Sequence, residues 1–116
     1  MAIMKKDPIQ FPDFAKLDLR VGLVTQAENV EKSTKLVRLH VDLGPDYGNV
    51  VILTGLQQFY KPEDFVGKKF IFLANLEPKA MMGETSNGMI FAADAGENGA
   101  ILTPVPDELA PGTIVR

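Results

Sequence analysis

The chain has 116 residues, of which 46% are hydrophobic and 23% are charged, and its formal net charge at pH 7 is −3. This composition excludes disordered and fibrous classes and predicts one globular domain over residues 1–116, large enough to bury its own core. The absence of cysteine excludes disulfides and thiolate metal sites and fits a cytoplasmic protein. The sequence has neither the apolar stretch of a signal peptide nor an apolar run that could span a membrane.

The acidic pI of about 5.1 argues against a general nucleic-acid binder, which commonly carries a basic surface. The charge is unevenly distributed, however. Residues 1–40 hold seven basic and five acidic residues, whereas residues 41–116 hold five basic and ten acidic residues. A phosphate-binding face would therefore draw on residues 1–40 and on Lys68, Lys69 and Lys79.

Two alternating stretches predict the first strands. Apolar and polar residues alternate through residues 19–24 and again through residues 37–43, which is the pattern of a strand with one buried and one solvated face. Gly22 lies in the middle of the first stretch and predicts a bulge or a sharp bend there. The turn-forming residues 44–49 then lead into a β-branched strand at 50–53.

The second half of the chain predicts shorter elements. Gly, Pro and Asn residues separate short apolar runs, which predicts strands at residues 69–74, 89–93, 100–103 and 113–115. Residues 96–99 predict a hairpin turn between two of these strands. Short helical turns are expected at residues 13–16, with Asp13 as the N-cap, at 62–66 and at 106–109.

The order of these elements indicates the fold class. The helical turn at residues 62–66 lies between the third and the fourth strand, so three strands, a helical turn and two strands follow one another. This is the arrangement of the oligonucleotide-binding (OB) fold. We therefore expect an all-β protein, a five-stranded OB-fold barrel with short helical turns and a small C-terminal β extension.

Residues that could carry catalysis are scarce and poorly placed. The single histidine, His40, lies on the polar side of its strand, and serine occurs only at positions 33 and 86, with no nucleophile-elbow pattern around either. The adjacent acids Glu63 and Asp64 point apart and suit a helix N-terminus better than a carboxylate pair. No phosphate-loop or metal-ligand spacing is present. We therefore predict a protein that is not an enzyme and that has neither a cofactor nor a metal site.

The connection that precedes the strand at 89–93 is rich in groups that can bind a ligand. Residues 75–89 carry amides, a lysine, a serine and several methionines. Amide and hydroxyl groups can hydrogen-bond base edges, methionine can pack on an unstacked base, and Lys79 can contact phosphate. The same stretch also fits a long hairpin with glycine turns and methionines that fill gaps in the core. The residues alone favour the hairpin interpretation, because methionine is a common gap-filler, and leave ligand binding open as the alternative.

Several motifs together resemble one known family. Residues 13–22 (DFAKLDLRVG) are similar to the opening of the tRNA-binding domain family, which includes the C-terminal domain of methionyl-tRNA synthetases, stand-alone dimeric tRNA-binding proteins and EMAP-II-type domains. Residues 74–79 (ANLEPK), 82–84 (MGE) and 86–89 (SNGM) match the family in order and at its spacing. Together with weaker matches elsewhere, the resemblance covers nearly the whole chain.

The resemblance implies an OB-fold barrel that binds tRNA by shape and backbone contacts, as a homodimer or in association with an aminoacyl-tRNA synthetase. Either the Phe11/Phe14 region or residues 101–106 would supply the dimer surface. Lysines are expected at phosphates, and surface amide, hydroxyl and methionine groups around an unstacked base. The site implied by the matching positions comprises Lys35, Asn75, Lys79, Ser86, Asn87, Gly88 and Met89.

The sequence departs from the family pattern at charged positions. Thr34 replaces the aspartate that precedes the family's lysine, and Ala80 and Met82 occupy positions that are often Lys or Arg. Each lost phosphate contact removes about one unit of salt dependence, so we expect tRNA binding to be weaker than is usual in the family. A related subgroup, the CsaA type, is linked to protein export as a chaperone-like dimer. Binding of a protein or peptide is therefore the alternative function.

Overall fold

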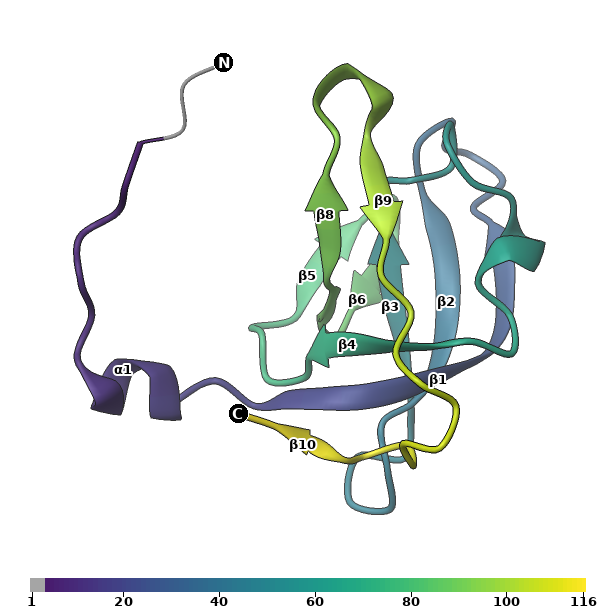
Figure 1. The fold of residues 1–116 in the computed structure, drawn as a ribbon. Coiled ribbons are helices and arrows are strands. Elements are labelled where there is room, and N and C mark those ends of the chain that lie inside the picture. The colour runs from purple at the N-terminus through teal and green to yellow at the C-terminus, as the bar shows by residue number, and fades with distance from the viewer. Residues whose placement is uncertain (1–3) are drawn as a thin grey trace.

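The computed structural model describes residues 4–116 (Figure 1). The elements in chain order are α1 (Phe11–Ala15), β1 (Leu19–Asn29), β2 (Val37–Asp42), β3 (Asn49–Thr54), η1 (Pro62–Asp64), β4 (Lys69–Leu73), β5 (Lys79–Met81), β6 (Glu84–Ser86), β7 (Met89–Ile90), β8 (Ala92–Asp94), η2 (Gly96–Asn98), β9 (Ala100–Leu102) and β10 (Ile114–Val115). None of the helices in this part of the chain is long and apolar enough to cross a membrane.

Five antiparallel strands form a nearly closed barrel, which confirms the predicted fold class. Their order is β3-β2-β1-β4-β7, and β10 extends the sheet beside β1. The barrel closes where the backbone N–H of Asn87, just before β7, donates to the carbonyl of Val51 on β3 at 2.9 Å. The hairpins β5–β6 and β8–β9 form two small sheets of their own, and Figure 1 shows β8–β9 projecting beside the barrel.

The long strand β1 serves both halves of the barrel. Its first part pairs with β4, from Leu19↔Leu73 to Leu23↔Lys69, and its second part pairs with β2 up to Asn29↔Val37. A register shift between Val24 and Gln26 marks a bulge where one partner gives way to the other. The bulge therefore lies beyond Gly22, where the sequence predicted a bulge or bend.

The physical reason for Gly22 is a close approach of side chains. A Cβ atom at this position would lie 2.6 Å from Cδ1 of Phe72 and 2.7 Å from Cγ1 of Val41. Both side chains belong to the fully buried core, so neither has free space into which it can move. Only glycine, which has no Cβ atom, therefore fits at this point of β1.

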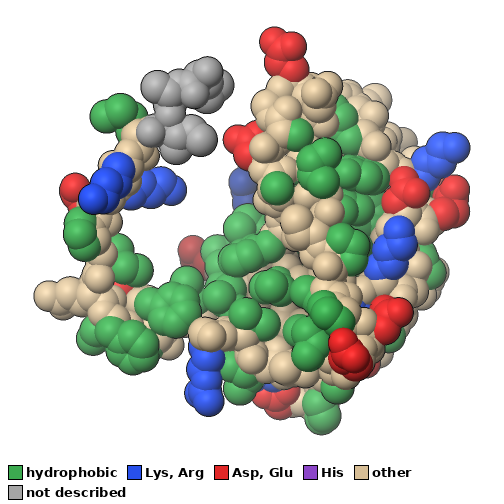
Figure 2. Space-filling view, in the orientation of Figure 1, with side chains coloured by type: hydrophobic (Ala, Val, Ile, Leu, Met, Phe, Trp, Pro, Cys, Tyr) green, Lys and Arg blue, Asp and Glu red, His purple; other side chains and the backbone are tan. Residues whose placement is uncertain are grey.

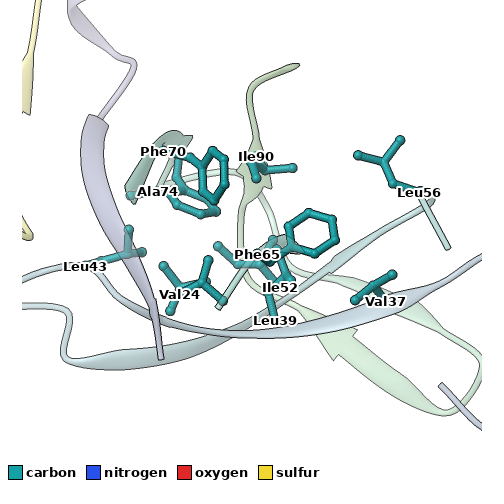
Figure 3. Packing of buried hydrophobic residues seen from close by; sticks show 12 residues of the cluster. Val24, Val37, Leu39, Leu43, Ile52, Leu56, Phe65, Phe70, Ala74 and Ile90 are labelled. Carbon is teal, nitrogen blue, oxygen red and sulfur yellow. The ribbon is translucent and has the colours of Figure 1, made fainter. Parts of the chain in front are cut away.

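Aromatic and branched side chains from many elements fill the barrel (Figure 3). The core contains three phenylalanines whose rings contact one another in sequence, Phe65, Phe70 and Phe72. The ring centroids are 6.3 Å apart in the tilted pair Phe65–Phe70 and 6.4 Å apart in the edge-on pair Phe70–Phe72. Phe65 directly follows η1, whose first turn is fixed by a 2.8 Å hydrogen bond from the Lys61 backbone N–H to the Asp64 carboxylate. The predicted helical turn between β3 and β4 thus carries one end of the core.

Three local predictions need correction. The first helix begins at Phe11 with Gln10 as its N-cap, so Asp13 lies within its first turn instead of capping it. Residues 106–109 form a hydrogen-bonded turn and no helix. The predicted strand at 89–93 is interrupted at Phe91, because the chain there leaves the barrel (β7) and enters the β8–β9 hairpin.

An ionic cluster ties the start of β1 to the loop between β2 and β3. Arg20 contacts Asp18 at 2.9 Å and Asp46 at 2.6 Å, and its guanidinium carbon lies 4.6 Å from the centre of the Tyr47 ring. The Arg20 guanidinium lowers the pKa of both carboxyl groups, and the hydrogen bond that the Tyr47 hydroxyl donates to Asp18 raises the pKa of that hydroxyl. The predicted loop at residues 44–49 is thereby fixed against the barrel.

We predict that Gly22→Ala destabilises the barrel by about 1–3 kcal/mol, because the added methyl group must displace buried side chains. Gly55→Ala is the matched control, since its backbone φ is not positive and a Cβ there meets nothing within 4 Å. That variant should be as stable as wild type or up to about 1 kcal/mol more stable. Urea denaturation followed by circular dichroism measures both, and equal stability of the two variants would contradict the packing argument.

Candidate nucleic-acid interface

A mainly apolar groove of about 570 Å³ opens between the end of β3, the β5–β6 hairpin and the β7–β9 region. Hydrophobic side chains form most of its lining, and the charged side chains of Glu77 and Lys79 border it. The apolar and sulfur-containing residues that define it include Leu53, Leu56, Met81, Met89, Ile90 and Phe91. A concave apolar surface bordered by a few polar groups is the usual form of a ligand site.

The groove brings together only part of the predicted site. Lys79, Ser86, Gly88 and Met89 line it, whereas Lys35, Asn75 and Asn87 do not. The exposed Lys35 lies in the connection between β1 and β2, where its carbonyl accepts a hydrogen bond from the Gln57 N–H at 3.0 Å. Because Gln57 directly follows the groove residue Leu56, this places the Lys35 backbone near one end of the groove.

Ser86 is a structural residue and not a surface contact. Its side chain is 3% exposed, and its hydroxyl oxygen accepts a hydrogen bond from the Leu53 backbone N–H at 3.0 Å. The hydroxyl group donates in turn to the Gly88 carbonyl at 3.2 Å. The expectation that Ser86 presents its hydroxyl at the barrel surface is therefore wrong. Its hydroxyl provides a hydrogen-bond acceptor for the Leu53 N–H at the edge of β3, where β6 ends.

Asn75 and Gly88 are also used within the fold. The Asn75 amide accepts a hydrogen bond from the Asp18 N–H at 2.9 Å and donates to the Lys16 carbonyl at 2.7 Å, which fixes the chain between α1 and β1. Gly88 has a φ of 143°, and a Cβ atom there would lie 2.8 Å from the Leu73 carbonyl oxygen. Only glycine therefore fits at position 88, where this segment contacts β4.

Lys79, Met89 and Asn87 keep groups that a ligand can reach. Lys79 is exposed and Met89 is 46% exposed at the groove. The Asn87 amide nitrogen makes two long contacts of 3.4 Å, to the carbonyls of Val51 and Thr85, and its side chain is half-buried. Across residues 4–116, no three His, Asp or Glu side chains converge as metal ligands would. The groove thus offers a ligand the cation of Lys79 and the apolar side chain of Met89.

Sequence reasoning missed the apolar floor of the groove and the ion pair behind its wall. Leu53 is nearly fully buried although it does not belong to the central core cluster, because it lies beneath the β5–β6 hairpin. Arg38 on β2 forms a bidentate ion pair with Glu84 on β6, and this contact lowers the pKa of the Glu84 carboxyl group. The apolar residues Val51 and Leu53 on the outer side of β3 are the signal in the sequence that a second layer covers this strand.

A small antiparallel barrel with an apolar, lysine-bordered groove defines a binding module of the OB class. The family model described as "Putative tRNA binding domain" matches residues 19–114. The match covers most of the chain, and the chain therefore belongs to this tRNA-binding domain family. The description of the family agrees with a groove that offers apolar surface and a bordering cation to a ligand.

The relatives include methionine–tRNA ligases and chaperones of the CsaA type. The chain is 45% identical over 112 residues to a methionine–tRNA ligase of Clostridium acetobutylicum. The matched region covers 96% of this chain but only 17% of the ligase. A methionyl-tRNA-synthetase-related protein of Pyrococcus horikoshii has the same fold, with a TM-score of 0.89, 37% identity and coverage of 96% of this chain and 100% of that one. The chaperone CsaA of Bacillus anthracis is similar at a TM-score of 0.84 and 30% identity, over 95% and 100% of the two chains.

We predict that Ser86→Ala lowers the free energy of unfolding by about 1–3 kcal/mol, because the buried Leu53 N–H loses its hydrogen-bond acceptor. Thr85→Ala is the control: the neighbouring Thr85 side chain is exposed on the same strand, and its replacement should change stability by less than about 0.5 kcal/mol. Thermal and urea denaturation report the difference. A Ser86→Ala variant as stable as Thr85→Ala would return Ser86 to the list of ligand contacts.

Proposed function

We propose that this domain binds tRNA at the groove without catalysing a reaction, with Lys79 and Lys35 at phosphates and Met89 against an unstacked base. The observation that carries the proposal is the position of Lys79 and Met89 on one apolar groove in a chain of the tRNA-binding domain family. A thioether side chain packs on any base face, and a lysine contacts any phosphate, so neither group reads a particular sequence. Recognition of tRNA by shape follows from such contacts.

The proposed binding is weak and sensitive to salt. Stacking of one base on an aromatic side chain contributes about 1–3 kcal/mol, which is the upper range for a base packed on Met89, and each lysine at a phosphate adds about one unit to the salt slope. Glu77 borders the same groove and repels phosphate, and Ala80 and Met82 supply no charge. A single domain therefore has few favourable contacts, and we infer that it acts in the cytoplasm beside a partner such as methionyl-tRNA synthetase, for which the ligase relatives provide the support.

Peptide binding is the second candidate function. Methionine side chains adapt to many apolar shapes, and both Met81 and Met89 line the groove. The similarity to the CsaA chaperone supports this alternative. The two functions differ in their physics, because apolar peptide binding persists at high salt whereas phosphate binding is lost.

We also propose that the protein is a homodimer. The helix α1 has no buried residue, and Ile9 and Phe11 are 68% and 76% exposed. Figure 2 shows hydrophobic side chains along this N-terminal segment, which in Figure 1 stands away from its own barrel. Exposed apolar side chains on such a segment are stabilised by packing on a second copy. Ile101 in the other predicted dimer region is 54% exposed and is the competing surface.

We expect Lys79→Ala to weaken binding to all tRNAs by a similar factor and to reduce the slope of log K against log salt by about one unit. Lys61→Ala is the matched control, because Lys61 is exposed next to η1 and does not line the groove. Filter binding of bulk tRNA at several salt concentrations measures both. A salt slope unchanged in Lys79→Ala would remove this lysine from the interface.

Sedimentation at micromolar concentration should give twice the 12.7 kDa mass of one chain. A double change of Ile9 and Phe11 to Asp should yield monomers, because charged groups cannot be buried unpaired between two copies. Ile101→Asp serves as the comparison and should leave the dimer intact. Monomeric wild-type protein would refute the dimer, and dissociation caused only by Ile101→Asp would assign the interface to the other surface.

A further inference from the structure

The β5–β6 hairpin forms one wall of the groove and is marginal as an isolated element. Each of its strands has three residues, and it forms a two-stranded sheet separate from the barrel sheet. Lys79 and Met81 on β5 line the groove. Two-stranded ribbons of this length are not stable in water without tertiary contacts. The position of this wall therefore depends on what holds the hairpin to the barrel.

The turn of the hairpin makes this dependence stronger. Met81 pairs with Glu84, so the loop consists of Met82 and Gly83, whose φ angles of 51° and 79° are both positive. A two-residue hairpin turn with positive φ at both positions favours Asn or Gly at the first one. Met82 is the one non-glycine residue with positive φ among residues 4–116. Met82 thus disfavours the backbone conformation that the hairpin turn requires.

Two contacts made by β6 compensate for the unfavourable turn by holding the hairpin to the barrel. The Ser86 hydroxyl holds the end of β6 to the Leu53 N–H of β3. Near the turn, both Nε and Nη2 of Arg38 donate to the two carboxylate oxygens of Glu84. Arg38 is itself oriented by Glu28 on β1, whose carboxylate lies 3.9 Å from the guanidinium and 3.0 Å from Nε2 of His40. The Arg38 and Glu84 side chains are 26% and 24% exposed, so water can compete for this contact.

We propose that the Arg38–Glu84 ion pair is a latch that positions the β5–β6 hairpin as a wall of the binding groove. The buried Ser86 contact acts as the fixed end of the hairpin, and the ion pair near the turn holds the free end. Breaking the pair releases the turn and with it the alignment of Met81, which pairs with Glu84, whereas Lys79 pairs with Ser86 at the fixed end. Arg38 and Glu84 are positioning residues in this assignment, and they need no contact with the ligand. The effect on binding rests on the proposed tRNA function, whereas the effect on the hairpin does not.

The direction in which Glu84→Gln changes the tRNA affinity distinguishes a latch residue from a simple surface acid. If Glu84 were only a surface acid near the groove, its removal would raise the affinity for a polyanion. The latch predicts the opposite, an affinity for bulk tRNA about three- to tenfold lower at fixed salt, because the groove wall at Met81 is no longer held in place. Glu77→Gln is the matched control, since it removes the same charge from the rim of the groove, and it should raise affinity.

Amide hydrogen exchange of the full chain tests the latch without tRNA. In Glu84→Gln, the amides of residues 79–85 should exchange about three- to tenfold faster while those of β2 and β4 keep wild-type protection. Arg38→Gln should produce the same local effect, and the double variant should add little to either single change. Met82→Asn in the Glu84→Gln background should restore protection, because Asn favours the turn on its own.

The outcomes separate the latch from the binding function. Wild-type exchange in the hairpin of Glu84→Gln, together with a gain in tRNA affinity equal to that of Glu77→Gln, would overturn the latch and leave the tRNA function standing. Faster exchange in a protein that binds no tRNA in any variant would refute the proposed function and leave the latch standing. Additive effects of Arg38→Gln and Glu84→Gln would show that the two residues act independently, which also rejects the latch.

Discussion

The barrel depends on one close approach, that of the β1 backbone at Gly22 to the ring of Phe72 and the side chain of Val41. These two side chains come from β4 and β2, the strands that flank β1 on its two sides. Because no atom stands between them and the β1 backbone, one strand can serve as a shared wall for both halves of the barrel. The groove follows from this closure, since its floor at Leu53 and its far side at Met89 belong to the two edge strands that closure brings together.

Most of the motif positions that mark the family have structural functions in this protein. Asp18 and Arg20 fix the start of β1, Asn75 fixes the chain that leads into it, and Ser86 and Gly88 fix the passage from β6 to β7. A sequence signature of this kind identifies the scaffold and the place of the groove. The chemistry of the groove rests on fewer positions, and these can change between members without loss of the fold.

The elements that a local pattern determines could be predicted from the sequence, and those that need a second layer could not. Alternation predicted β1 and β2, and the acids after Pro62 predicted η1, because strand and cap signals depend on neighbours in the chain. The groove was not predictable, since Leu53 and Met81 come to line one groove only after the hairpin folds over β3. Ser86 was misassigned for the same reason: a serine in a polar stretch carries no sign that a strand edge far along the chain uses its hydroxyl.

The pairing partners of β1 also set the order in which this chain can fold. Strands β1, β2 and β3 are joined by short connections, so their pairing closes only small loops. The pairing of Leu19 with Leu73 and with Val115 closes much longer ones. Since loop-closure entropy opposes distant contacts until others reward them, we expect the three-stranded meander to form first and the pairing of β4 and β10 with β1 to limit the rate. A barrel built around one shared strand is therefore complete only when β4 and β7 have joined the meander.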